Sequence, residues 1–228
     1  MNIKIKALIS GFIFSVIFSF IRFSGNCDNI SNKIFRLHII ANSDSAEDQA
    51  LKLKVRDRIL NEFGSNFLDA NDIISAENIA EKNLDKIQNI SKDEINKNGF
   101  SYPVSVKIVH MYFNTRYYGN VTMPAGYYDA LRITIGEAKG KNWWCVMFPP
   151  MCVPAAEGST ELEKILNDFE IDITTSQDKY VIEFKMVDIY LKVRELINEF
   201  ILTPTSEFFS SCDAPYDIDF AFLKSFSI

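Results

Sequence analysis

An uncharged, mostly apolar run near the start of the chain sets the first constraint on folding. It covers residues 7–21, with Lys4 and Lys6 before it and Arg22 after it. Positive charge followed by an apolar stretch is typical of a signal peptide or signal anchor, although a comfortable membrane span needs about 17–25 residues. We therefore expect residues 1–25 to be a signal peptide or anchor, either cleaved after export or retained. The alternative, a buried core helix, fits these flanks poorly.

The charge balance limits the class of partner. The chain has 228 residues, with 24 Lys and Arg against 30 Asp and Glu, which gives a formal net charge of -6. Nucleic acids and anionic lipid headgroups both select basic surfaces. We therefore expect a protein partner and no nucleic acid. Membrane contact is expected only through the N-terminal apolar segment, if that segment is not cleaved.

Helical and strand patterns alternate along the rest of the chain. Residues 26–33 are polar and predict a linker, whereas residues 34–40 predict a strand with Phe35, Leu37 and Ile39 on one face. The other predicted elements are a helix from a cap at Ser45 to Phe63, a second helix after a cap at Ser75, strands over 104–113, 131–135 and 142–148, a helix over 161–169, a strand over 179–187 and a helix over 188–201.

This order of elements predicts an α+β fold. We expect one domain over residues 34–202, in which helices pack on an antiparallel or mixed sheet. Residues 203–228 show no clear period and predict a C-terminal tail or packing arm.

The cysteines and histidines give weak signals for catalysis or metal binding. Cys145 with His38 and either Asn42 or Asp44 is one arrangement for a hydrolase triad. A cysteine nucleophile needs an exposed turn or a helix N-terminus, however, and Cys145 lies inside an apolar strand directly after two tryptophans. The two histidines lie far apart and the cysteine spacing does not match a zinc site. We therefore expect no catalytic residue, no metal and no cofactor.

Cys145 and Cys152 flank a Pro-Pro turn at 149–150. A short excursion and return of the chain would bring the two sulfurs within bonding reach, and export makes oxidation feasible. A disulfide and two reduced cysteines in the core both fit this pattern.

Three charged residues fall within the apolar arc of the helix that follows Ser45. Asp48, Lys52 and Arg56 are spaced at i, i+4 and i+8, and charges on a core-facing side must find partners or reach solvent. One interpretation is an ion-paired ladder that orients the helix. The other is a recognition edge beside Asn42.

Two blocks of sequence resemble the stage II sporulation protein R family. The first is RLHIIANSDS at 36–45, with similarity continuing to Asp57. The second consists of YPV at 102–104, YGN at 118–120, PAGYYDALR at 124–132, IGE at 135–137 and GKNWWCVMFPPMC at 140–152, in the family's order. The resemblance covers roughly residues 34–153. It departs at Asn114, where we expect proline, and at Ala138, where glycine is commoner.

The resemblance implies a signalling role and not an enzyme. Family members are made in the forespore and exported into the space facing the mother cell. There they trigger a membrane-embedded aspartic protease in the mother-cell membrane, which processes the pro-form of sigma factor E. For this chain we expect a partner-binding surface formed by His38, Asn42, Asp44, Asp48, Arg56, Gly136, Glu137, Lys141, Asn142, Trp143 and Trp144.

Strand alternation predicts that Trp143 and Trp144 point to opposite faces, so that at least one is deeply buried.

Two other functions stay open. One is an exported hydrolase that uses Cys145. The other is a septal wall-binding module, for which the Tyr117-Tyr118 and Tyr127-Tyr128 pairs supply aromatic rings.

Overall fold

The computed structural model describes residues 3–151 and 161–202. It divides into two compact units, Met1–Ile189 and Tyr190–Ile228. The sheet and all candidate site residues lie in the first unit. The predicted tail over 203–228 and the predicted disulfide partner Cys152 lie outside the described residues.

A four-stranded mixed sheet forms the centre of the first unit. Its strands are β1 (Phe35–Ile40), β2 (Val104–Phe113), β5 (Gly126–Ile135) and β6 (Asn142–Phe148), in the order β2-β5-β1-β6. β1 runs parallel to β5 and antiparallel to β6, and β2 runs antiparallel to β5. The mixed sheet with packed helices confirms the predicted α+β class.

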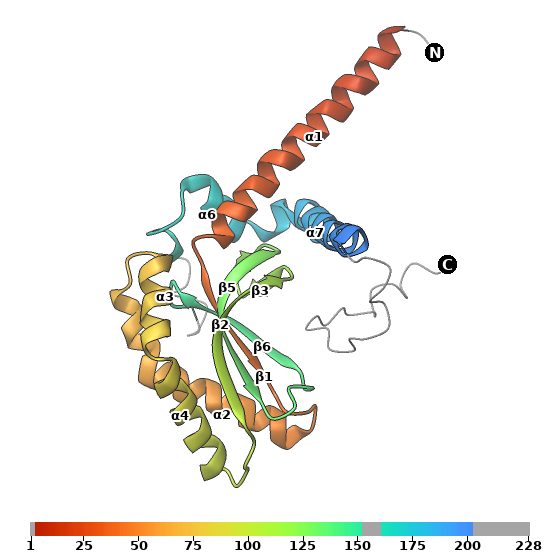
Figure 1. The fold of residues 1–228 in the computed structure, drawn as a ribbon. Helices are drawn as coiled ribbons and strands as arrows, with labels where there is room; N and C mark the ends of the chain where they lie inside the picture. The colour runs from red at the N-terminus through yellow and green to blue at the C-terminus, as the bar shows by residue number, and fades with distance from the viewer. Residues whose placement is uncertain (1–2, 152–160, 203–228) are drawn as a thin grey trace. The chain divides into compact units, whose positions relative to one another are not determined.

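Helices cover one face of this sheet (Figure 1). They are α2 (Ala46–Phe63), the 3₁₀ helix η1 (Gly64–Asp69), α3 (Ile73–Lys82) and α4 (Leu84–Lys97). Phe35, Leu37 and Ile39 point into this layer and are fully buried, as their alternation predicts. The core between the layers also holds Leu51, Val55, Ile59, Phe63, Ile87, Ile95, Leu131, Ile133 and Ile135.

Helix starts follow capping chemistry. Ser45 caps α2 as predicted, because its side chain accepts a hydrogen bond from the Asp48 backbone N–H. The single second helix predicted after Ser75 is instead the pair α3 and α4. Asp72 is the N-cap of α3, and Ser75 is the third helical residue that completes the capping box with it.

The opposite face of the sheet carries a buried cation under a small hairpin, formed by β3 (Arg116–Tyr118) and β4 (Val121–Met123). Arg36 is fully buried there and donates a hydrogen bond of 2.5 Å to the Tyr118 hydroxyl. Its guanidinium also lies 4.3 Å from the ring centroid of Phe113 and 4.9 Å from that of Tyr128. Aromatic faces therefore supply most of its stabilising contacts.

The apolar N-terminal segment is a single helix, α1 (Ile3–Ser31), of 29 residues. By length and composition it is the one helix in the described ranges that could cross a membrane. Most of its residues before Phe23 are exposed, whereas Phe23, Cys27 and Ile30 are buried. The linker predicted over 26–33 is therefore helical up to the end of α1, because apolar residues at helical spacing pack it onto the body.

Two predictions in the C-terminal half were wrong. Residues 179–187 are not a strand: the 3₁₀ helix η2 (Gln177–Lys179) leads into the helix α7 (Val181–Leu202). Tyr180, Phe184 and Val187 are buried at spacings of four and three, which is a helical period. The helix predicted over 161–169 is interrupted: residues 161–162 are helical, residues 163–165 form a turn, and α6 (Asp168–Thr175) begins after the cap Asn167.

These helices meet α1. The Phe23 ring lies 5.4 Å from the ring of Tyr180 and 5.5 Å from that of Phe184, measured between centroids. The end of α1 is therefore part of the domain core.

A truncation of the central strand tests the assignment of the core. Leu37→Ala should lower the free energy of unfolding by about 2–5 kcal/mol, because a fully buried side chain leaves a cavity in the helix-side core. Leu68→Ala is the control, since Leu68 is 65% exposed, and it should change stability by less than about 0.5 kcal/mol. Urea titration monitored by circular dichroism measures both, and equal losses would contradict this core.

Candidate partner-binding site

The structure brings the predicted site residues together at one end of the sheet. They come from β1 and the turn that follows it, from α2, from the turn between β5 and β6, and from the start of β6. We call the contact between the 41–45 turn and the 136–141 turn the two-turn junction.

Asn42 is the central link of the junction. Its side-chain Oδ1 accepts a hydrogen bond of 3.0 Å from the Glu137 backbone N–H, and its Nδ2 donates one of 2.9 Å to Asp48 Oδ2. Gly136 has a φ of +60°, and a Cβ there would lie 2.1 Å from Asn42 Oδ1. The junction therefore requires glycine at 136, both for backbone conformation and for space.

Backbone contacts close the other half of the junction. The Lys141 N–H donates to Asp44 Oδ1 at 2.6 Å, and the Gly140 N–H donates to the Ala41 carbonyl at 3.0 Å. Ala138 has a φ of +53°, in the region that favours glycine. This explains why the family pattern commonly has glycine at 138, the position where this sequence departs from it.

Asp48 is a buried carboxylate held by hydrogen bonds. Oδ2 accepts from the Ser43 hydroxyl at 2.5 Å and from Asn42. Burial alone would raise the pKa of Asp48, but the hydrogen bonds from Ser43 and Asn42 outweigh it and hold the pKa below its ordinary value. The charge of Asp48 therefore belongs to the junction and is not offered to solvent.

Of the two interpretations of the charges along α2, the ion-paired ladder was wrong. The Lys52 ammonium donates to the Lys141 carbonyl at 2.8 Å and to Gln49 Oε1 at 2.6 Å. Burial lowers the pKa of Lys52. Arg56 pairs with Asp57 at 2.6 Å and lies 4.2 Å from the Trp143 ring centroid. Each charge thus has its own partner, and Lys52 fastens α2 to the junction.

The other side of β6 carries a stacked pair. The rings of His38 and Trp144 are nearly parallel with centroids 3.8 Å apart, and His38 Nε2 lies 2.8 Å from Asn142 Oδ1. Trp143 and Trp144 do face opposite sides of the sheet, as predicted. The expectation that one is deeply buried was wrong, because both lie on an edge strand and remain half-buried.

Sequence reasoning missed Ser43, Gln49 and Gly140, which complete the junction. The Gln49 side chain donates to the Ser43 carbonyl at 2.8 Å. A Cβ at Gly140 would lie 2.2 Å from the same carbonyl oxygen. Their signals in the sequence were their positions within the family-like stretches and beside a turn and a helix start, and neither signal separates a junction from an ordinary loop.

Cys145 cannot act as a free nucleophile in this structure. It is buried and disulfide-bonded. The pairing with Cys152 stays a prediction, because Cys152 lies outside the described residues. In the described ranges no group of three or more His, Cys, Asp or Glu side chains is arranged to hold a metal ion.

The tyrosine pairs do not form a platform for stacking on a glycan. Tyr117 is exposed, but Tyr128 is fully buried and donates to the Pro124 carbonyl at 2.7 Å. Tyr118 is occupied with Arg36 and with the Trp144 carbonyl, at 3.3 Å. Within the part of the chain that the structure describes, these two tyrosine pairs therefore do not form the exposed aromatic face predicted for wall binding.

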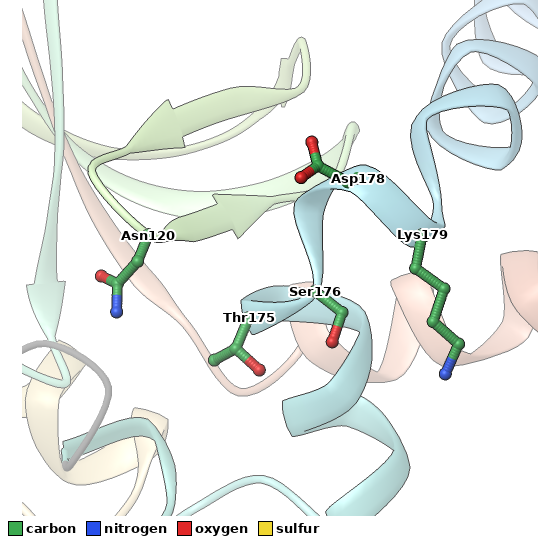
Figure 2. Close-up of a pocket in the computed structure, with 5 residues that line it drawn as sticks. All are labelled: Asn120, Thr175, Ser176, Asp178 and Lys179. Atoms are coloured by element: carbon green, nitrogen blue, oxygen red, sulfur yellow. The ribbon is translucent and has the colours of Figure 1, made fainter.

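A shallow polar hollow lies beyond the hairpin, and Figure 2 shows its lining. It is formed by Asn120, Thr175, Ser176, Asp178 and Lys179. Lys179 is already paired with Asp172. Hydrogen bonds, of which the one from Lys179 has the largest effect, lower the pKa of Asp172 to about 2. The hollow is therefore a solvated surface feature with no arrangement for chemistry.

Replacing Gly140 tests the tightness of the junction. Gly140→Ala should cost about 1–3 kcal/mol, since the new methyl group would overlap the Ser43 carbonyl. Gly64→Ala is the matched control, because a Cβ there meets nothing within 4 Å. Thermal unfolding of both variants gives the comparison, and a neutral Gly140→Ala would show that the turns are not in close contact.

The Asp48 carboxylate predicts an acid dependence of stability. Because its folded pKa is lowered, its contribution is present above the ordinary pKa of 3.8 and is lost as the pH falls through the folded value. Asp48→Asn should therefore cost about 1–3 kcal/mol near neutrality, and the deficit should shrink in acid. Urea titrations across the acid range measure it, with exposed Glu47→Gln as the control. A deficit that does not change with pH would refute the role of the charge.

Comparison with known proteins agrees with the sequence resemblance. The family described as Stage II sporulation protein R matches residues 31–157. The chain is 41% identical over 123 residues to Stage II sporulation protein R of Bacillus subtilis (strain 168), which covers 54% of this chain and 55% of that protein. The chain thus spans about half the length of this curated relative, and no solved structure matches it. The matched residues contain both turns of the junction and every strand of the main sheet, and the chain belongs to the stage II sporulation protein R family.

Proposed function

We propose that this chain is an exported signalling protein of sporulation that activates a membrane-embedded aspartic protease of the mother cell. The protease then processes the pro-form of sigma factor E. Membership of the stage II sporulation protein R family is the observation that carries the proposal. The chain itself is a ligand in this scheme and not a catalyst.

The N-terminal helix supports export from the forespore into the intermembrane space. α1 is long and apolar enough to serve as a signal or anchor segment. It joins the body directly, so a retained α1 would hold the domain at the outer surface of the membrane that it crosses.

The two-turn junction supports binding of the protease. An activator shifts the protease from its inactive to its active state only by binding the active state better. A surface that is already rigid loses little entropy on binding. The hydrogen bonds of Asn42, Asp44 and Asp48 fix both turns before any partner arrives. Glu137 and Lys139 project from this rigid base and are well exposed. We assign the contacts that favour the active state of the protease to the Glu137–Lys139 pair and to the neighbouring Trp143 on the edge strand β6.

A substitution at the projecting pair tests the docking surface. Glu137→Ala removes an exposed charge without touching the junction, so folding should be unchanged. Processing of the sigma factor precursor in sporulating cells should fall roughly three- to tenfold, as expected for a contact worth about 1 kcal/mol. Asp93→Ala is the matched control, because Asp93 forms a similarly exposed pair with Lys97 on α4. Unchanged processing in Glu137→Ala, with normal protein levels, would remove this surface from the proposal.

A further inference from the structure

The face of the sheet opposite the helices carries a row of four side chains that crosses the strands, and two of the four are cations. Lys107 on β2 is paired in register with Arg132 on β5. Arg132 is next to His38 on β1, and His38 is opposite Trp144 on β6. Residues paired in register on adjacent strands share a face of the sheet. Leu131 and Ile133, the chain neighbours of Arg132, face the helices, so this row faces away from them.

Two further cations adjoin the row. The Arg116 guanidinium lies 5.5 Å from the Trp144 ring centroid. Arg36, two residues before His38 on β1 and on the same face, is fully buried, and neither its Nε nor its Nη1 has a hydrogen-bond partner. Arg132 Nε is also buried without a hydrogen-bond partner. We call Lys107, Arg132, Arg116 and Trp144, with Arg36 beneath them, the cationic face.

The cationic face lacks the counter-charges found elsewhere. Across the described residues, no carboxylate lies within 4.0 Å of the four cations, whereas basic side chains such as Lys33, Lys97 and Lys164 have carboxylate partners. This is unexpected in a chain whose net charge is -6. Like charges directly opposite one another on paired strands also destabilise a sheet, so Lys107 beside Arg132 carries a cost in the free protein.

We infer that the cationic face binds an acidic, extended segment of a protein partner. Carboxylates would neutralise the charges of Lys107 and Arg132, while Trp144 offers an apolar contact. Lys107 is exposed and Arg132, Arg116 and Trp144 are half-buried, so these four side chains can be reached from solvent, whereas His38 between Arg132 and Trp144 is buried. Strands about 4.8 Å apart give the row a length of about 14 Å, which matches roughly four extended residues.

A lipid headgroup layer fits this face less well. A planar bilayer is reached by projecting side chains, and clusters of four to eight basic residues are the usual membrane signal. Here Arg36 is fully buried, and Arg132 and Arg116 are half-buried, so only Lys107 projects freely toward a planar surface. A flexible peptide segment can instead follow the partly exposed side chains one by one. The inference rests on the proposed function only in taking a protein as the partner.

The test uses the full chain in detergent and a fluorescent peptide in which glutamate alternates with threonine. Wild type should bind this peptide, with an affinity that falls as salt rises, and should not bind the counterpart with lysine in place of glutamate. Lys107→Glu should weaken binding by about tenfold or more. Lys92→Glu, an exposed charge reversal on α4, should change the affinity by less than about twofold.

Lys107→Glu also separates loss of binding from loss of folding. The new carboxylate would lie opposite Arg132, so the melting temperature should rise by about 2–4 °C while binding falls. The inference is overturned if wild type does not bind the acidic peptide, or if Lys107→Glu binds it as well as wild type. Loss of binding to phosphatidylglycerol vesicles but not to peptide in Lys107→Glu would assign the face to lipid and also overturn it. None of these measurements depends on activation of the protease.

Discussion

The buried Asp48 carboxylate is the constraint on which the rest of the site depends. It lies at the start of α2, and its hydrogen bonds from Asn42 and Ser43 fix the path of the chain where β1 ends. Asn42 then holds the turn between β5 and β6 through Glu137, and Lys52 holds the start of β6 through the Lys141 carbonyl. A charge that is costly to bury thus specifies how three elements, distant in the sequence, are placed together.

The sheet separates two kinds of chemistry. Its helix-covered face is apolar and supplies most of the stability through burial of Phe35, Leu37 and Ile39. Its other face holds the buried Arg36, the stacked His38 and Trp144, and the unpaired Arg132. Adjacent residues of one strand serve the two roles, because successive side chains of a strand point to opposite faces. The two-turn junction lies at one end of the sheet, beside both of these faces.

Much of the fold could be predicted from local patterns. Alternation identified β1, β2 and the second half of β5, a mostly apolar run identified β6, and the Ser45 cap identified the start of α2. The apolar pattern wrongly predicted a strand at residues 179–187, because apolar residues at helical spacings of three and four are mixed there with apolar residues at other spacings. Only the burial of Tyr180 and Phe184 on one side identifies a helix. The candidate site residues were selected from the resemblance and from the spacing of charges along α2, but their contacts were not predictable. Nothing local shows that Asp48 bonds Asn42 and not Lys52, since that choice depends on how the 136–141 turn packs.

The continuous helix α1 gives removal of the leader a structural cost. Proteolysis between Ser24 and Asn26 would separate Phe23 from the rest of the domain. The rings of Tyr180 and Phe184 would then lose their neighbour and become open to water. A mature form trimmed at that point would begin inside a helix, with a new charged terminus close to the buried Cys27. Trimmed and untrimmed forms of this protein would therefore differ in conformational stability as well as in attachment.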